Sequence, residues 1–289
     1  MPTVRAATIL FIFFVVTLIG IPWQWSAVRF RLPRRKRFPH RYHSWLCRLF
    51  GIRLIVIGKP VQDRGVLMLA NHTSYLDILV LSGAARVSFV AKKEVNSWPF
   101  FGTLARMQET VFVERDRRSQ TGAARDTIRR RVMDGDALVL FPEGTSNDGN
   151  HVLPFRSALM GAAESEIGRD AQGQAQHVPV QPVTVTYVGL HGIPMGRENR
   201  PMFAWYGDMD LVPHLWEGVK TGPVDVVVEF HPPMTVDSAG GRKALAATAE
   251  TIVRAGQTKA LAGTYWDLPR LGAARERPRR TPRFAKAPA

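Results

Sequence analysis

The chain begins with a long apolar segment, continues with short apolar runs that alternate with amphipathic stretches, and ends in a polar, basic stretch. The short runs are rich in Val, Ile and Leu, which predicts β-strands. The predicted strands are residues 53–57, 66–70, 87–91, 110–114, 137–141, 178–187 and 224–230. Helical periodicity predicts helices at residues 75–81, 120–133, 155–167 and 242–261.

Strands separated by helices predict an α/β fold in which helices flank a mixed or largely parallel sheet. Binding sites in such sheets gather where strands end in loops. The polar segment GRDAQGQAQ, residues 168–176, is predicted to be a loop. At 289 residues the chain is long enough for one main domain with appendages, which we place at residues 50–262. The Pro- and Arg-rich residues 263–289 are predicted to form a basic, disordered tail.

The N-terminal apolar segment predicts a membrane anchor. Residues 6–21 carry no charge, and the uncharged stretch continues through two Trp residues to Val28. Sixteen helical residues cover about 24 Å, so spanning the ~30 Å hydrocarbon core requires the Trp-containing extension. A cleaved signal peptide is the alternative, but only Arg5 precedes the run and Trp25 stands where a cut after Ala27 needs a small residue.

The formal net charge of +15 is carried by the two ends of the chain. Residues 1–62 hold 11 Lys and Arg and no acidic residue, and residues 269–289 hold seven basic residues and one acidic residue. Nucleic-acid binding proteins carry such charge on the folded domain, so nucleic acid is not an expected partner.

Six basic residues follow the apolar run between Arg29 and Arg37, against the single Arg5 before it. The positive-inside rule then predicts an inner (cytoplasmic) membrane protein with its domain on the cytoplasmic face. The basic cluster favours contact with an anionic membrane surface. Residues 1–49 are therefore predicted to be an anchor helix with a basic juxtamembrane segment.

Several common chemistries are not indicated. The single Cys47 excludes an internal disulfide and a Cys-rich zinc site. The sequence contains no GxxxxGK[ST], GxGxxG, HExxH or GxSxG motif, which argues against nucleotide, zinc-hydrolase and covalent serine-hydrolase chemistry. No metal site is predicted.

The stretch NHTSYLD, residues 71–77, allows two interpretations. Ser74 and Asp77 have the spacing of a capping box at the start of the helix at residues 75–81. Alternatively, Asp77 orients the imidazole of His72 and stabilises its charged form, which leaves the other ring nitrogen as a general base.

Three further stretches place polar groups at or near predicted strand ends. Arg115 follows the strand at residues 110–114 and suits bidentate phosphate binding. FPEGTS, residues 141–146, follows the strand at residues 137–141, and its glycine allows backbone to approach a ligand. VPV, residues 178–180, is explained most simply as a strand edge or bulge.

Taken in order, NHTSYLD, VFVER, FPEGTS and VPV resemble the four motifs of the glycerolipid acyltransferase family, which includes the 1-acyl-sn-glycerol-3-phosphate acyltransferases. The resemblance covers roughly residues 50–235. It implies the glycerol-3-phosphate acyltransferase-like fold and direct transfer of an acyl chain from acyl carrier protein or coenzyme A, without a cofactor, to the hydroxyl of a membrane lipid acceptor.

The resemblance also implies roles for individual residues. His72 would accept the proton of the acceptor hydroxyl, and Asp77 would orient it. The residues that would bind the substrate are Arg115, Glu143, Gly144, Thr145, Ser146, Lys92 and Arg156, with Lys93 beside Lys92 in the same family stretch.

Two residues depart from the family pattern. Glu109 stands where many members have Gly, and Glu114 replaces the usual Asp before the arginine. Negative charge beside a phosphate-binding arginine is unfavourable for a dianionic acceptor. The main hypothesis is transfer to 1-acyl-sn-glycerol-3-phosphate to give phosphatidic acid. The runs TVFVERDRR, FPEGTSNDGNHVLPF and YVGLHGIPMGR resemble lyso-ornithine lipid acyltransferases, which favours that lipid as the alternative acceptor.

Two other classes of function stay open. The chain could be a non-enzymatic membrane-surface binding protein in which NHTSYLD only caps a helix, or a lysolipid hydrolase. The enzymatic hypotheses require His72, Asp77, Glu143 and Arg115 to converge on one cleft, whereas the binding hypothesis does not.

Overall fold

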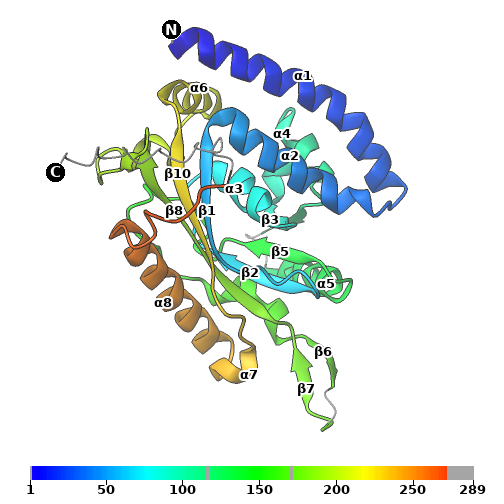
Figure 1. Cartoon of the computed structure of the whole chain (residues 1–289). Helices are drawn as coiled ribbons and strands as arrows, with labels where there is room; N and C mark the ends of the chain where they lie inside the picture. The colour runs from blue at the N-terminus through cyan, green and yellow to red at the C-terminus, as the bar shows by residue number, and fades with distance from the viewer. Residues whose placement is uncertain (1, 115–117, 170–171, 272–289) are drawn as a thin grey trace, which may run out of the picture.

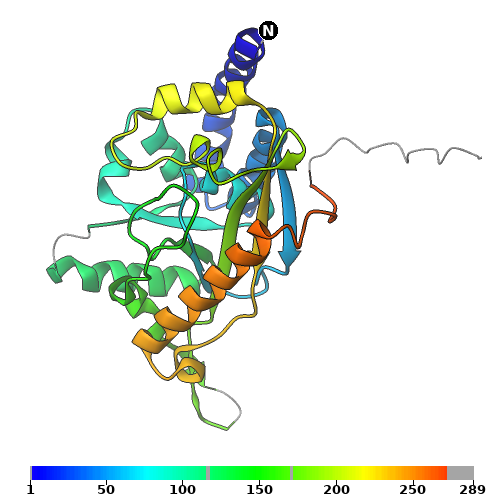
Figure 2. The same ribbon diagram turned by 90° about the vertical axis from the view of Figure 1, so that its left-hand side faces the viewer.

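The computed structural model describes residues 2–114, 118–169 and 172–271 and shows an eight-stranded mixed sheet flanked by helices (Figures 1 and 2). Along the sheet the strands are β1 (Ile52–Gly58), β10 (Val224–Phe230), β8 (Val180–Leu190), β2 (Val66–Ala70), β5 (Ala137–Leu140), β3 (Ser88–Lys92) and β4 (Val111–Val113), with β9 (Ile193–Pro194) beside β8. Strand β8 pairs antiparallel with β10 and β9, and the other pairs are parallel. The predicted α/β class is confirmed.

Two hydrophobic cores lie on opposite faces of the sheet. In β2, Met68 packs into one core and Leu67 and Leu69 into the other, because successive strand residues point to opposite faces. The first face carries α1 (Pro2–Arg29), α2 (Arg34–Phe50), α3 (Leu76–Ala84), η1 (Lys93–Ser97), α4 (Phe101–Met107), η3 (Arg200–Met202) and α6 (Leu211–Thr221). The second carries α5 (Arg118–Met133), the 3₁₀ segment η2 (Ser157–Glu164), α7 (Val236–Ala239) and α8 (Arg242–Leu261).

Helix α1 lies along the domain instead of projecting from it (Figure 1). Arg5 Nη2 donates to the carbonyl of Val219 in α6 at 2.9 Å, and Gln24 Nε2 donates to the carbonyl of Met107 in α4 at 2.8 Å. Between these two contacts, Phe13 is buried in the first core. The helix is therefore attached to the domain over most of its length.

The outward face of α1 is apolar and open. Of the described residues, α1 alone forms a helix long and apolar enough to cross a membrane, and 17% of its most apolar window is buried. Large exposed apolar side chains along it are Val4, Phe11, Phe14, Val15, Leu18, Ile19, Trp23 and Trp25. An exposed apolar stripe of this length marks a surface that is covered by something other than water.

The structure differs from the sequence prediction between residues 155 and 177. The helix predicted at residues 155–167 is the shorter 3₁₀ segment η2, in which Met160, Ala162 and Ala163 are all fully buried. These positions do not follow a 3.6-residue period. The predicted loop at residues 168–176 contains most of an antiparallel hairpin of β6 (Glu166–Arg169) and β7 (Ala175–His177).

The first part of the predicted tail packs on the domain. Trp266 lies against the sheet, and Arg270 Nε is 2.9 Å from Oδ1 of the fully buried Asp225. The backbone of Leu271 pairs with that of Leu54 in β1. The domain therefore extends to residue 271, and residues 272–289 lie outside the described part.

Candidate active site

The imidazole of His72 and the carboxylate of Asp77 form a hydrogen bond. His72 follows β2, Asp77 lies in the first turn of α3, and His72 Nδ1 is 2.9 Å from Asp77 Oδ2. The Asp77 side chain is fully buried, whereas that of His72 is 22% exposed. A carboxylate only accepts, so Nδ1 carries the proton and Nε2 holds the free lone pair. This is the tautomer that a general base requires.

Asp77 also holds the loop before α3. Its Oδ2 accepts the backbone N–H groups of Thr73 at 2.7 Å and Ser74 at 3.0 Å, and its Oδ1 accepts the hydroxyl of Tyr187 at 2.9 Å. Together with His72, four donors stabilise the carboxylate. Half of the predicted capping box is thus present, and the same carboxylate makes the predicted contact with His72. The two interpretations of NHTSYLD do not exclude each other.

Aromatic stacking fixes the plane of the His72 ring. The ring lies 4.0 Å, centroid to centroid, from Phe141 at an interplanar angle of 18°, and Phe141 in turn stacks on Phe89 at 6.3 Å. Phe141 directly follows β5, so the end of this strand positions the ring that packs against His72. With Nδ1 bound and one face covered, Nε2 is the nitrogen that the site offers to a substrate.

Glu143 ties the FPEGTS turn to the NHTSYLD loop. Its Oε1 accepts the backbone N–H of His72 at 3.0 Å, and its Oε2 accepts Asn147 Nδ2 at 2.8 Å. Burial, which outweighs these hydrogen bonds, raises the pKa of Glu143 to about 8. Both carboxyl oxygens face the protein, so Glu143 positions the backbone that carries His72.

The other residues expected at the site surround this pair at the ends of β3, β4 and β5. Lys92 ends β3 and is exposed, and Lys93 Nζ is 3.1 Å from Glu114 Oε2 after β4. Gly144 adopts a φ of +80°, and a Cβ there would lie 3.4 Å from the guanidinium carbon of Arg156.

Thr145 is exposed, and Ser146 Oγ donates to the carbonyl of Trp205. Arg115 lies outside the described residues. The described members of the predicted set therefore gather at one edge of the sheet, and His72 contacts both Asp77 and Glu143.

Comparisons with known proteins agree with this geometry. Residues 53–186 match the Acyltransferase family model. The lyso-ornithine lipid O-acyltransferase of Brucella abortus is 44% identical over 261 residues, which cover 90% of this chain and 97% of the relative.

The chain belongs to the acyltransferase family.

Other acyltransferases resemble it to different extents. The lyso-ornithine lipid O-acyltransferase of Rhizobium meliloti is 43% identical over 83% of this chain and 81% of its own. The 1-acyl-sn-glycerol-3-phosphate acyltransferase of Neisseria gonorrhoeae is 31% identical over 60% of this chain and 63% of its own. The crystal structure of the 1-acyl-sn-glycerophosphate acyltransferase of Thermotoga maritima superposes with a TM-score of 0.56 at 24% identity, covering 90% and 97% of the two chains, which shows a shared fold.

Two residues of the acyltransferase site were not predicted from the sequence. Tyr187, buried in β8, donates to Asp77 from 110 residues away, and burial raises its pKa well above the usual value, so it remains a donor. The side-chain amide of Asn71 both donates to and accepts from the backbone of Val185 at 2.8 Å, which continues the β2–β8 pairing beyond the strand. In the sequence, the position of Asn71 directly after an apolar strand was the only indication of this contact.

Gly149 was also missed. It has a φ of +76°, and a Cβ there would lie 2.9 Å from Thr73 Cγ2 in the NHTSYLD loop. The turn after FPEGTS can approach the catalytic loop only because this residue lacks a side chain.

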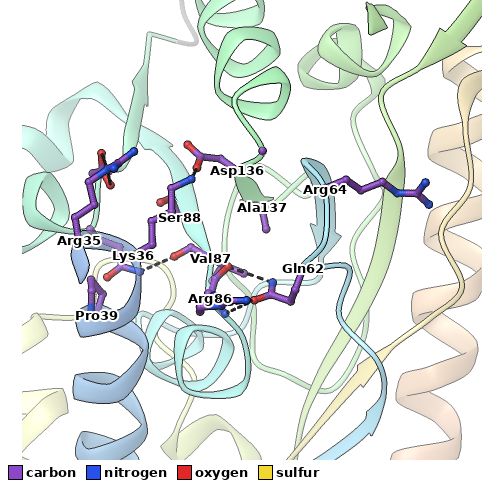
Figure 3. Close-up of a pocket in the computed structure, with 13 residues that line it drawn as sticks. Arg35, Lys36, Pro39, Gln62, Arg64, Arg86, Val87, Ser88, Asp136 and Ala137 are labelled. Carbon is purple, nitrogen blue, oxygen red and sulfur yellow. Dashed lines mark hydrogen bonds and ion pairs between the residues drawn. The ribbon is translucent and has the colours of Figure 1, made fainter. Parts of the chain in front are cut away.

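Glu109 lies apart from the other residues that were expected at the acceptor site. It precedes β4, at the opposite strand end from Glu114, in a polar cavity of about 220 Å³ (Figure 3). Both of its oxygens lie 3.2 Å from Arg35 Nε in the first turn of α2, and Asp136 pairs with Lys36 in the same turn. These carboxylates offset the unfavourable position of two cations at a helix N-terminus.

An apolar cavity of about 150 Å³ lies on the first face of the acyltransferase sheet, between α1, α2, α3, β3 and α4. Its walls include Phe13, Leu46, Phe50, Ile78, Trp98 and Leu104. Phe89 also lines it, and this ring stacks on Phe141 beneath His72. The cavity thus approaches His72 from the side of the sheet that carries α1.

Proposed function

We propose that this acyltransferase moves a fatty acyl chain from an acyl thioester to the hydroxyl group of lyso-ornithine lipid. The observation that carries the proposal is the His72–Asp77 pair, which the stacked rings of Phe141 and Phe89 connect to an apolar cavity. The choice of acceptor rests on the relatives, because those named for lyso-ornithine lipid align over up to 97% of their length, whereas the gonococcal relative named for 1-acyl-sn-glycerol-3-phosphate aligns over 63%. The acceptor of the main hypothesis from the sequence, 1-acyl-sn-glycerol-3-phosphate, is the comparison substrate.

The reaction needs one base and no acyl-enzyme. Nε2 of His72 takes the proton of the acceptor hydroxyl as its oxygen attacks the thioester carbonyl carbon, and Asp77 stabilises the resulting imidazolium. When the tetrahedral intermediate collapses, the C–S bond breaks and the thiolate takes the proton from Nε2. A positioned base of this kind contributes about 10²–10⁴ in rate.

The head group of the acceptor would lie where β3, β4 and β5 end. In a lysolipid the hydroxyl and the head-group anion are separated by a few bonds of about 1.5 Å, so cations must lie near His72. Lys92 and Arg115 are proposed for this contact, with the Thr145 hydroxyl and the backbone at Gly144, while Glu143 holds the turn. Ser146 Oγ bonds to the Trp205 carbonyl and supports the same turn.

The apolar cavity is proposed to hold a fatty acyl chain, and α1 to lie in one leaflet of the inner membrane on its cytoplasmic side. A helix with one face on a protein and an apolar face outward suits the membrane interface. A perpendicular crossing would break the contacts of Arg5 with α6 and of Gln24 with α4. A lipid in that leaflet enters the cavity without crossing water.

The test is acyl transfer by purified enzyme in lipid vesicles. Labelled acyl carrier protein thioester is supplied with lyso-ornithine lipid or 1-acyl-sn-glycerol-3-phosphate, and His72→Ala is the control. We expect labelled ornithine lipid from the wild type and almost none from the variant. Labelled phosphatidic acid alone would refute the proposed acceptor.

Two further results of the same assay would refute the enzymatic proposal. Free labelled fatty acid without lipid product would indicate a lysolipid hydrolase. Binding to vesicles without any turnover, equal in wild type and His72→Ala, would indicate a membrane-binding protein.

A further inference from the structure

A second cavity, of about 230 Å³, lies on the face of the sheet away from α1. Val113 and Ile128 of the second core form part of its wall. Three arginines from three separate elements line it: Arg125 of α5, Arg156 before η2 and Arg242 at the start of α8. Gly144, which directly follows Glu143, also lines the cavity, so the cavity lies beside the FPEGTS turn of the active site.

Two of these arginines, Arg125 and Arg242, meet at Gly161. A Cβ at Gly161 would lie 3.2 Å from Arg125 Cδ and 3.6 Å from Arg242 Nη1. A bare backbone at this position of η2 therefore allows both side chains to cross it. Arg156 lies at one end of η2, beside Gly144, and Arg125 and Arg242 meet farther along η2, at Gly161.

The positive charge of the cavity is only partly balanced by the described residues. Glu114 lines the cavity and pairs with Lys93 at 3.1 Å. Arg242 Nη1 is 3.6 Å from Glu164 Oε2, and Arg125 Nε is 3.8 Å from Asp126 Oδ1, distances too long for hydrogen bonds. Arg242 Nε is buried without a hydrogen-bond partner in the described part of the chain. The site is prepared for an anion with several acceptor oxygens.

The distance between Arg156 and the Arg125–Arg242 pair decides which anion fits the cavity. Gly161 follows Arg156 by five residues, and a 3₁₀ segment rises about 2 Å per residue, so the backbone that Arg125 and Arg242 cross lies about 10 Å along η2 from the backbone of Arg156. The anion of a lysolipid head group lies only a few bonds from the reacting hydroxyl and does not reach this far. A pantetheine arm has two amide groups between its thiol and its phosphate and is about as long as an extended tetrapeptide, on the order of 14 Å.

We infer that Arg125 and Arg242 bind the phosphate of the donor's 4′-phosphopantetheine arm, while the thioester lies beside His72. Acyl carrier protein and coenzyme A share this arm, so the site serves either donor. The inference rests on the proposed transfer from a thioester. It assigns the two faces of the sheet to two substrates, with lipid on the side of α1 and the water-soluble donor on the side of α5 and α8.

The experiment compares donors that differ by one phosphate. Acyl-4′-phosphopantetheine and acyl-pantetheine are used with the wild type, Arg125→Gln, Arg242→Gln and the double variant. We expect the double variant to raise KM for the phosphorylated donor roughly tenfold to a hundredfold, with acyl-pantetheine and the acceptor unchanged. Arg129→Gln, which removes the same charge from the same helix outside the cavity, is the matched control.

Two donor series distinguish the sources of the phosphate. Acyl carrier protein and coenzyme A thioesters should lose affinity by the same factor in the double variant. Loss with the carrier protein alone would mean that these arginines contact the protein surface, and a raised KM for the lysolipid would mean that they bind its head group. Either result overturns the inference.

A binding measurement separates this inference from the proposed function. Calorimetric titration of the wild type with 4′-phosphopantetheine and with pantetheine needs no turnover. Preference for the phosphorylated compound, lost in the double variant, is the expected result even if no lipid is acylated. Equal binding of the two compounds would refute the site, and thermal unfolding confirms that each variant is folded.

Discussion

The Asp77 carboxylate holds His72 and the loop that carries it through a single oxygen atom. Oδ2 is 2.9 Å from His72 Nδ1 and also accepts two backbone N–H groups of residues 73 and 74. The orientation of the base and the conformation of the loop are thereby set by one group. Changes at Asp77 should affect both catalysis and stability.

Asp77→Asn should lower kcat about 10²- to 10⁴-fold with little change in KM, because an amide does not stabilise the imidazolium and does not select its tautomer. The unfolding free energy should fall by about 1–3 kcal/mol, since the amide NH₂ meets backbone donors. Steady-state kinetics and urea unfolding measure the two effects, with the exposed Asp126→Asn as control. A folded variant with near wild-type kcat would contradict the assigned role.

Tyr187→Phe should lower kcat about tenfold in a folded protein. The change removes one of the four donors to Asp77 and leaves the buried ring in place. A purely structural tyrosine would not change kcat in the folded protein, whereas loss of this donor should lower kcat with little change in KM. Tyr206→Phe serves as the control, and a wild-type kcat in a folded Tyr187→Phe protein would speak against the coupling.

Glu143 should make the protein less stable as the pH rises. Its pKa is raised from 4.5 to about 8 by burial, so between these values the native state holds a proton that the unfolded state has released. Stability from this group is complete below pH 4.5 and falls by about 1.4 kcal/mol per pH unit up to pH 8. Glu143→Gln should remove this slope, measured by urea unfolding between pH 5 and 8. Parallel pH dependence in both proteins would refute the raised pKa.

Gly149→Ala should destabilise the protein by about 1–3 kcal/mol and reduce activity, because a positive φ and contact with Thr73 Cγ2 both oppose a side chain. Gly135→Ala is a matched control, with a φ of +83° and no atom within 4 Å of the added Cβ. The difference in unfolding free energy between the variants reports the close approach to the catalytic loop. Equal losses would show that backbone strain alone is responsible.

Local patterns in the sequence were sufficient to predict seven strands of the main sheet and the contact between His72 and Asp77, but not β6, β7 or β9. Strands β2 and β10 have the predicted bounds, and His72 and Asp77 are five residues apart in one loop and helix start. These features depend on side-chain alternation and on short-range hydrogen bonds, both of which neighbouring residues determine.

Contacts between distant segments could not be predicted in this way. Tyr187 reaches Asp77 only because β8 lies beside β2, and that adjacency places residues 110 apart in contact. The pairing of Glu109 with Arg35 likewise joins residues 74 apart in the chain, which no local pattern relates. The arginines of the second cavity come from three elements and form no linear motif.

The outward face of α1 should carry membrane binding. Ile19 is 70% exposed on this face. The variant Ile19→Glu should lower the fraction of protein that sediments with anionic vesicles at least tenfold, because a charge at that depth opposes insertion. Met133→Glu, at an exposed apolar position of α5 on the other face of the sheet, should bind as the wild type does. Unchanged sedimentation of Ile19→Glu would exclude α1 as the membrane contact.

Phe13 of α1 is part of the wall of the apolar cavity and is packed against Phe50 and Phe100. Deleting α1 to obtain a more soluble enzyme would therefore remove part of the cavity wall as well as the proposed membrane contact. It would open the apolar cavity to water on one side and, on the proposed function, change the chain lengths that the enzyme accepts. The proposed membrane attachment and the proposed acyl-chain selectivity therefore depend on the same helix.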